Sequence, residues 1–233
     1  MQTEAIAYSD GDMALTGWLV RPECAPTAAI LILPTIANRN EAMDRRAAML
    51  ADAGYLVFIA DFYGLPDASI EQLFEAGRAL MADTPAFRQR IRAACDKAEK
   101  IAAGLPLFSM GFCMGGRGVL ELARTGAPIR SAISFHGLLA TDMPANGRID
   151  AKILVCHGDA DPMVPRGDVA AFQTEMDAAG ADWQLMVFGG AKHGFTDPAS
   201  DLRDNDAVAY HEQADRQSWS AAMLLIEHSL AAA

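Results

Sequence analysis

The sequence predicts a single α/β domain over residues 1–233, with a mostly parallel central sheet of about eight strands and helices on both faces. Strand-like and helix-like patterns alternate along the chain, which is the element order of a parallel sheet with crossover helices. Several strand patterns are apolar at every position, as expected for strands covered on both faces. The connections are short, and no linker or internal repeat interrupts them.

Eight segments carry the strand patterns. The first two, 4–8 and 13–20, flank the turn sequence Ser9-Asp10-Gly11-Asp12 and are predicted to form a hairpin. The later segments are the candidates for the parallel part of the sheet. They are residues 28–33, 55–60, 105–110, 131–135, 153–156 and 183–188.

Helical patterns fill the spaces between these strands. Asn40 is predicted to cap a helix that buries Met43, Ala47 and Leu50 on one face and ends at Gly54. In the last predicted helix, Trp219, Met223, Ile226 and Leu230 form the inner face. This last helix is expected at residues 207–230, and the other helices are expected at residues 69–82, 85–102, directly after 116 and at 167–179.

The charge balance and the cysteines limit the class of function. Thirty acidic residues against nineteen basic residues give a net charge of −11, which argues against nucleic acid or an anionic membrane as a partner. The sequence shows no signal-peptide pattern and no apolar run near the roughly 18 residues of a membrane span. Cys24, Cys95, Cys113 and Cys156 have no C-x-x-C spacing, so we predict free thiols and a cytoplasmic location.

Residues 111–116, Gly-Phe-Cys-Met-Gly-Gly, lie between a predicted strand and a predicted helix. Strand, G-x-C-x-G and helix are the arrangement of a nucleophile elbow, here with cysteine in place of serine. The glycines allow strand and helix to approach closely, because no Cβ atom intervenes. At the helix N-terminus the dipole and the free N–H groups favour a thiolate. We therefore predict that Cys113 is a nucleophile.

Two further residues follow predicted strands in an informative order. Asp161 comes after the strand at 153–156, and His193 comes after the strand at 183–188. Nucleophile, acid and histidine in this chain order are typical of the α/β-hydrolase fold. His193 would take the proton of the thiol, and Asp161 would fix the imidazole tautomer. The backbone N–H groups of Met114 and Ile36 are the expected oxyanion donors.

Several alternatives compete with these assignments. Asp159 is a second candidate for the acid, although Pro162 biases Asp161 towards an extended conformation that points out of its loop. His136 is expected to line the pocket, and His157 to be a hydrogen-bonded loop residue. A zinc site built from Cys156, His157 and His193 is disfavoured by their spacing, so no metal is predicted.

Motifs spread over nearly the whole chain resemble the dienelactone hydrolase family of α/β-hydrolases. They are Asp61-Phe62-Tyr63-Gly64, the elbow at 111–116, Ser134-Phe135-His136-Gly137, the segment 157–165 with Asp161-Pro162, and His193-Gly194-Phe195. The resemblance implies that Cys113, His193 and Asp161 form the triad of a cofactor-free hydrolase. Such an enzyme opens esters or lactones through a thioester intermediate.

Two positions depart from the family pattern. Thr35 stands where the prototype enzymes have a glutamate that contacts the resting thiol, and Asp197 stands where they have an arginine that holds the substrate carboxylate. A carboxylate at 197 would repel an anionic lactone, so a neutral ester is the expected substrate. Arginines that could supply positive charge instead are expected on the solvated surface. They are Arg39, Arg88 and Arg117.

The sequence therefore predicts a hydrolase of a small-molecule ester or lactone that needs no cofactor and is a monomer or a homodimer. Thr35, His136 and Phe195 are the predicted substrate contacts. The competing hypothesis is a protein of the same fold that binds ligands or senses oxidants through Cys113 without catalysis. An intact set of Cys113, Asp161 and His193 favours the enzyme.

Overall fold

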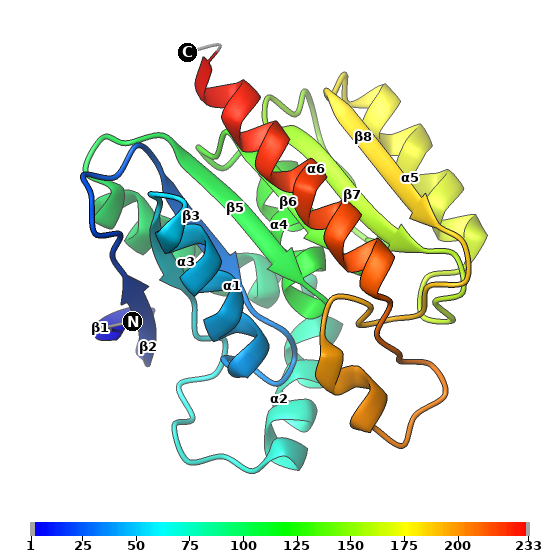
Figure 1. Cartoon of the computed structure of the whole chain (residues 1–233), viewed down its shortest axis with the longest axis horizontal. Helices are drawn as coiled ribbons and strands as arrows, with labels where there is room; N and C mark the ends of the chain where they lie inside the picture. The colour runs from blue at the N-terminus through cyan, green and yellow to red at the C-terminus, as the bar shows by residue number, and fades with distance from the viewer. Residues whose placement is uncertain (1–2, 232–233) are drawn as a thin grey trace.

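The computed structural model describes residues 3–231, and its eight strands form one sheet in the order β1-β2-β4-β3-β5-β6-β7-β8 (Figure 1). β1 (Thr3–Asp10) and β2 (Met13–Val20) form the predicted antiparallel hairpin, and β2 is also antiparallel to β4 (Leu56–Ile59). Every other pair of neighbouring strands is parallel. The predicted fold class, an α/β-hydrolase fold with a mostly parallel sheet, is confirmed.

The middle of the sheet is buried on both faces. Almost every residue of the central strands is shielded from solvent, which explains why these segments are apolar without alternation. β8 lies at the edge and is partly exposed. The remaining strands are β3 (Ala29–Leu33), β5 (Leu107–Phe112), β6 (Ser131–Phe135), β7 (Lys152–Gly158) and β8 (Trp183–Phe188).

Helices cover both faces of the sheet. Figure 1 shows α1 (Glu41–Asp52) and α6 (Glu212–Ala231) in front of it, where they bury an apolar cluster against β3 to β7. α3 (Thr84–Ala102), α4 (Met114–Arg124) and α5 (Arg166–Ala178) bury a second cluster on the other face. α2 (Ile70–Ala82) packs partly buried side chains against this second cluster.

The predicted start of α1 agrees with the structure, whereas the predicted start of the last helix is wrong. The Oδ1 atom of Asn40 accepts the N–H of Met43 at 3.1 Å and caps α1. α6 begins at Glu212 instead of residue 207, because residues 207–211 pair with the backbone of residues 193–195. A short 3₁₀ helix, η1 (Pro198–Leu202), precedes this segment and was not predicted.

The inner face of α6 differs in detail from the prediction. Ile226 is fully buried, while Trp219, Met223 and Leu230 are only partly buried against the front cluster. The other buried apolar side chains of this helix belong to Ala214, Ala222 and Leu225. In the part of the chain that the structure describes, no helix has both the length and the apolar composition to cross a membrane.

The topology brings the predicted site residues to one edge of the sheet. β3, β5, β6, β7 and β8 are consecutive parallel neighbours, so their carboxyl ends meet at the same edge. The residues that follow these five strands include Ile36, Cys113, His136, Asp161 and His193. Loops at this edge form the candidate active site.

Candidate active site

Cys113 occupies a strained turn between β5 and α4. Its backbone has φ 55° and ψ −115°, a conformation that a non-glycine residue rarely adopts. A Cβ atom at Gly111 would collide with the carbonyl of Gly115, and one at Gly115 would collide with the carbonyl of Leu33. The two glycines of the motif are therefore required by the close contact between β5, α4 and β3.

His193 lies beside Cys113 and is held by Asp161. The Nδ1 atom of His193 is 2.8 Å from Oδ2 of Asp161, and both side chains are buried. The other carboxylate oxygen of Asp161 accepts the N–H of Met163 at 2.8 Å. Asp159, the alternative acid, instead forms an ion pair with Arg166 at 2.7 Å.

The proximity of Cys113 and His193 shifts the pKa values of both side chains. Burial raises the pKa of the Cys113 thiol, but nearby His193 and the N–H groups of Met114 and Ile36 outweigh burial, so the net pKa is lowered. Burial lowers the pKa of His193, but the charge of Cys113 and the hydrogen bond with Asp161 raise it to about 10. Both shifts favour a thiolate beside an imidazolium, while the Nε2 atom of His193 has no hydrogen-bond partner among the described residues.

The loop that carries Ile36 is fixed by polar contacts from the loop after β4. The hydroxyl of Tyr63 donates to the carbonyl of Ile36 at 2.9 Å. The carboxylate of Asp61 accepts the Asn38 amide at 2.9 Å and the backbone N–H groups of Thr16, Tyr63 and Gly64. These contacts orient the N–H of Ile36. Sequence reasoning did not assign Asn38, Asp61 or Tyr63 to the site, although the motif at 61–64 was visible.

Thr35 and His136 both line the cavity, and both are already engaged in hydrogen bonds. The hydroxyl of Thr35 accepts from the N–H of Ala37 and from the amide of Asn40, each at 3.2 Å. Thr35 thus also shapes the Ile36 loop, which limits its freedom to bind a substrate.

His136 contacts the backbone of Cys113. Its Nδ1 atom accepts the backbone N–H of Cys113 at 3.2 Å, so we assign the ring proton to Nε2, which lies 2.9 Å from the hydroxyl oxygen of Thr196. Burial and the adjacent His193 hold the pKa of His136 well below its ordinary value. Both effects favour a neutral His136, the form that can accept the Cys113 N–H. Thr196 was not among the predicted residues.

Phe195 and His157 lie outside the cavity. Phe195 is fully buried and packs edge-on against His136, with ring centroids 5.3 Å apart. His157 is part of β7 and buried, and its Nδ1 atom has no hydrogen-bond partner among the described residues, so the expectation of a hydrogen-bonded loop residue is wrong. Cys156, its neighbour, is fully buried in the front cluster. Within residues 3–231, no three His, Cys, Asp or Glu side chains are grouped to hold a metal ion.

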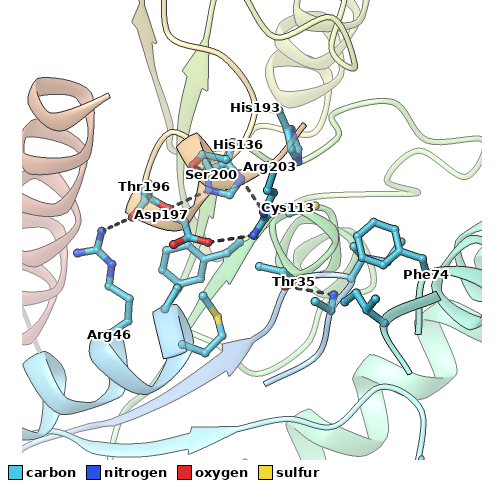
Figure 2. A pocket seen from close by; sticks show the side chains of 17 residues that line it. Thr35, Arg46, Phe74, Cys113, His136, His193, Thr196, Asp197, Ser200 and Arg203 are labelled. Atoms are coloured by element: carbon cyan, nitrogen blue, oxygen red, sulfur yellow. Dashed lines mark hydrogen bonds and ion pairs between the residues drawn. The ribbon is translucent and has the colours of Figure 1, made fainter. Parts of the chain in front are cut away.

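A cavity of about 250 Å³ opens beside Cys113 and has two unlike walls (Figure 2). The apolar wall consists largely of side chains from α1, α2 and their flanks. These are Ile36, Ala37, Ala42, Met43, Ile70, Phe74 and Phe112. The opposite wall is polar and is built by the segment that follows His193. Its members are Thr196, Asp197, Ser200 and Arg203, with Arg46 reaching in from α1.

The charged side chains on the cavity wall are paired. Arg46 is buried, forms an ion pair with Asp215 and lies over the Trp219 ring at 4.5 Å. Asp197 and Arg203 form an ion pair at 3.0 Å. Neither Arg46 nor Arg203 was assigned to the site from the sequence.

The arginines named in the sequence analysis lie elsewhere. Arg39 pairs with Asp44 at 2.7 Å and does not line the cavity. Arg88 and Arg117 are largely buried around Glu121, so the expectation that they are solvated surface residues is wrong. Their charge is used inside the helical layer, where Glu121 has no solvent exposure.

Comparisons with known proteins agree with this architecture. A family model described as "Dienelactone hydrolase family" matches residues 15–230. A probable 2-oxo-3-(5-oxofuran-2-ylidene)propanoate lactonase of Bradyrhizobium sp is 27% identical over 251 residues, covering 99% of this chain and 98% of the relative. The solved structure of m3DLH is 33% identical, with a TM-score of 0.89 and 98% of each chain covered. P91, a dienelactone hydrolase-like promiscuous phosphotriesterase from metagenomic libraries, is 32% identical, with a TM-score of 0.88, 97% of this chain and 98% of P91 covered.

Proposed function

The chain belongs to the dienelactone hydrolase family, a family of ester and lactone hydrolases, and on this premise we propose that it hydrolyses a small-molecule ester or lactone through a thioester on Cys113. The observation that carries the proposal is that Cys113 and His193, which Asp161 holds at 2.8 Å, line the same cavity of about 250 Å³. The N–H groups of Ile36 and Met114 next to the sulfur support it further.

In the acylation step, the Cys113 thiolate attacks the carbonyl carbon and forms a C–S bond. The carbonyl oxygen becomes an oxyanion, which the N–H groups of Ile36 and Met114 stabilise. The imidazolium of His193 gives its proton to the leaving alkoxide as the C–O bond breaks. His193 is then neutral, and the acyl group is held as a thioester.

In the deacylation step, His193 takes a proton from a water molecule that attacks the thioester carbonyl. The C–S bond breaks, the acid leaves, and the thiolate and imidazolium are restored. Asp161 keeps the same ring tautomer through both steps by its 2.8 Å contact with Nδ1. The cycle is balanced without an oxidant, a reductant or a cofactor.

The test is hydrolysis of a panel of short esters and small lactones by the wild type and by Cys113→Ala. We expect turnover in the wild type and a loss of at least about 10³-fold in the variant, because removal of a nucleophile leaves only the catalysis of the remaining site. When the reaction with an activated ester is quenched before deacylation, mass spectrometry of the protein should find the acyl group on Cys113. Equal hydrolysis by both proteins would rule out the thioester route. The panel should also include one phosphotriester, because the similar protein P91 is described as a promiscuous phosphotriesterase.

The competing function is a non-catalytic protein that binds ligands or senses oxidants through Cys113. The lowered pKa of Cys113 favours it, because a thiolate is also the form that oxidants attack. Thr35, which lacks the carboxylate of the family prototypes, is compatible with it. This function predicts that Cys113 reacts with peroxide while no panel member is turned over. Hydrolysis that is lost in His193→Gln would rule it out.

A further inference from the structure

Asp197 and Arg203 face each other on the polar wall of the cavity. Oδ2 of Asp197 is 3.0 Å from the nearest guanidinium nitrogen of Arg203, and Figure 2 draws this contact as a dashed line. Oδ1 of Asp197 accepts the N–H of Ala199 at 3.0 Å and caps η1. The side chain of Asp197 is only 17% exposed and that of Arg203 is 45% exposed. The carboxylate is thus fixed by two contacts, while the guanidinium reaches towards solvent.

The ion pair completes the charge balance of the cavity. His193 faces Cys113 and Asp161, and Arg46 faces Asp215. Among the lining residues that the structure describes, Arg203 is the remaining cation, and Asp197 is its counter-ion. At this wall an anionic substrate would be repelled by the Asp197 carboxylate, and the guanidinium of Arg203 that could bind the anion is already paired. A neutral substrate meets no such opposition.

We propose that Asp197 selects against anionic substrates by occupying Arg203, so that this site takes neutral esters and lactones. This inference rests on the proposed hydrolase function and names its substrate class. Arg203 could bind an anion, but in this chain the Asp197 side chain already neutralises it. Asp197 is a specificity-determining residue that takes no part in the chemical steps. Removing its charge should therefore raise the reaction rate with an anionic substrate relative to the rate with a neutral one.

The first test measures charge selection without any hydrolysis. Iodoacetamide and iodoacetate have nearly the same size, and both alkylate a thiolate, but only iodoacetate is an anion. The rate ratio of iodoacetate to iodoacetamide at Cys113 is measured by peptide mass mapping, which separates it from exposed Cys24. In Asp197→Asn, which keeps an oxygen that can cap η1, we expect the ratio to rise about threefold to tenfold at low salt. High salt should reduce the rise.

Two variants serve as controls for this ratio. Asp206→Asn makes the same change in net charge at an exposed residue with no hydrogen bond or ion pair among residues 3–231, and its ratio should equal that of the wild type. Asp197→Asn combined with Arg203→Gln should lose the rise, because the receptor is gone. An unchanged ratio in Asp197→Asn would overturn the proposal. An equal rise in Asp206→Asn would overturn it as well, because the effect would then be one of net charge.

The second test uses esters with matched shape, 4-acetoxybenzoate and 4-acetoxybenzamide. We expect the wild type to favour the neutral amide, and Asp197→Asn to raise kcat/KM for the anion about threefold to tenfold relative to the amide. A wild type that prefers the anion would contradict the inference. If neither ester is hydrolysed by any variant, the proposed function is contradicted, while the alkylation ratio still decides the role of Asp197. The two failures are therefore distinguishable.

Discussion

At the scale of single residues, the reactivity of the site depends on charges that Cys113 and His193 share. Burial opposes the ionised form of each, and their proximity is the largest of the effects that outweigh burial. Asp161 adds a fixed carboxylate on the far side of the imidazole. The proton affinities of Cys113 and His193 are therefore coupled, and removing either side chain changes the proton affinity of the other.

This coupling predicts the pH dependence of Cys113 alkylation by iodoacetamide. The pKa of the thiol lies below its usual value, so the thiolate should persist, and alkylation should stay fast, until the pH falls through that lowered pKa. In His193→Gln the imidazolium is absent, and burial then raises the pKa of the thiol. We expect the variant to react at least about tenfold more slowly at pH 6.5 and to recover its rate only in the alkaline range.

The profile is measured by mass mapping of the Cys113 peptide across the pH range. Exposed Cys24 in the same digest is the internal control and should behave alike in both proteins. Superimposable profiles for wild type and His193→Gln would show that His193 does not hold the thiolate.

The residue scale also shows what a sequence can predict about a site. Cys113 and its two glycines are a local signal because they form one contiguous motif, although only Gly111 is required within its own turn, and Gly115 is required by the carbonyl of Leu33 in β3. Asp161 and His193 follow from topology, since each comes directly after a parallel strand. Arg203 could not be predicted in this way. Its position depends on how the whole segment after His193 folds back on itself.

At the scale of elements, the loop after β3 and the loop after β4 act as one unit. Asn38 has a positive φ of 61°, and its amide donates to Asp61, so the β3 loop is held in an unusual turn by a partner in the loop after β4. Tyr63 then reaches the Ile36 carbonyl. An N–H group that must meet a developing oxyanion needs this kind of support, because a small misplacement weakens the contact in the transition state.

Tyr63→Phe tests this support. The variant loses the 2.9 Å hydrogen bond to Ile36 and keeps the ring in the apolar cluster. We expect kcat to fall about tenfold with little change in KM, which is less than the 10²–10³-fold loss of a whole oxyanion donor. Steady-state kinetics with a neutral ester measures it. Tyr55→Phe is the matched control, because the Tyr55 hydroxyl makes no hydrogen bond within residues 3–231. A kcat equal to the wild type would exclude a positioning role for Tyr63.

Element boundaries show where sequence reasoning loses accuracy. The start of α1 was predicted because Asn40 caps it with its own side chain, which is a local interaction. The start of α6 was predicted wrongly, because residues 207–211 are compatible with a helix when only the local sequence is considered. Their backbone groups are taken instead by residues 193–195, including the pair of hydrogen bonds between His193 and Ala207 and Ala209. A competing partner distant in sequence decided the outcome, and periodicity contains no information about it.

At the scale of the whole molecule, the parallel sheet and its covering helices have separate tasks. The carboxyl ends of five neighbouring strands gather the site at one edge. The helices α3, α4 and α5 are joined behind the sheet by a buried ionic network centred on Glu121 of α4. Arg88 of α3 contacts Glu121 at 2.7 Å, and Arg124 contacts both Glu121 at 3.0 Å and Glu175 of α5 at 2.8 Å. This network holds α4, and hence the elbow at its N-terminus, in place.

Glu121→Gln tests how far the fold depends on this network. The substitution keeps the side-chain size but leaves Arg88 and Arg124 facing each other without their shared carboxylate, which has no solvent exposure. We expect the free energy of unfolding to fall by about 3 kcal/mol, because breaking a buried ion pair leaves uncompensated charge in the interior. Urea titration followed by circular dichroism measures it. Asp150→Asn, which removes the exposed partner of Arg148, should change stability by less than about 0.5 kcal/mol. If Glu121→Gln lowers the free energy of unfolding as little as Asp150→Asn does, water or neighbouring backbone carbonyls already satisfy the arginines. Apolar packing alone would then position α4.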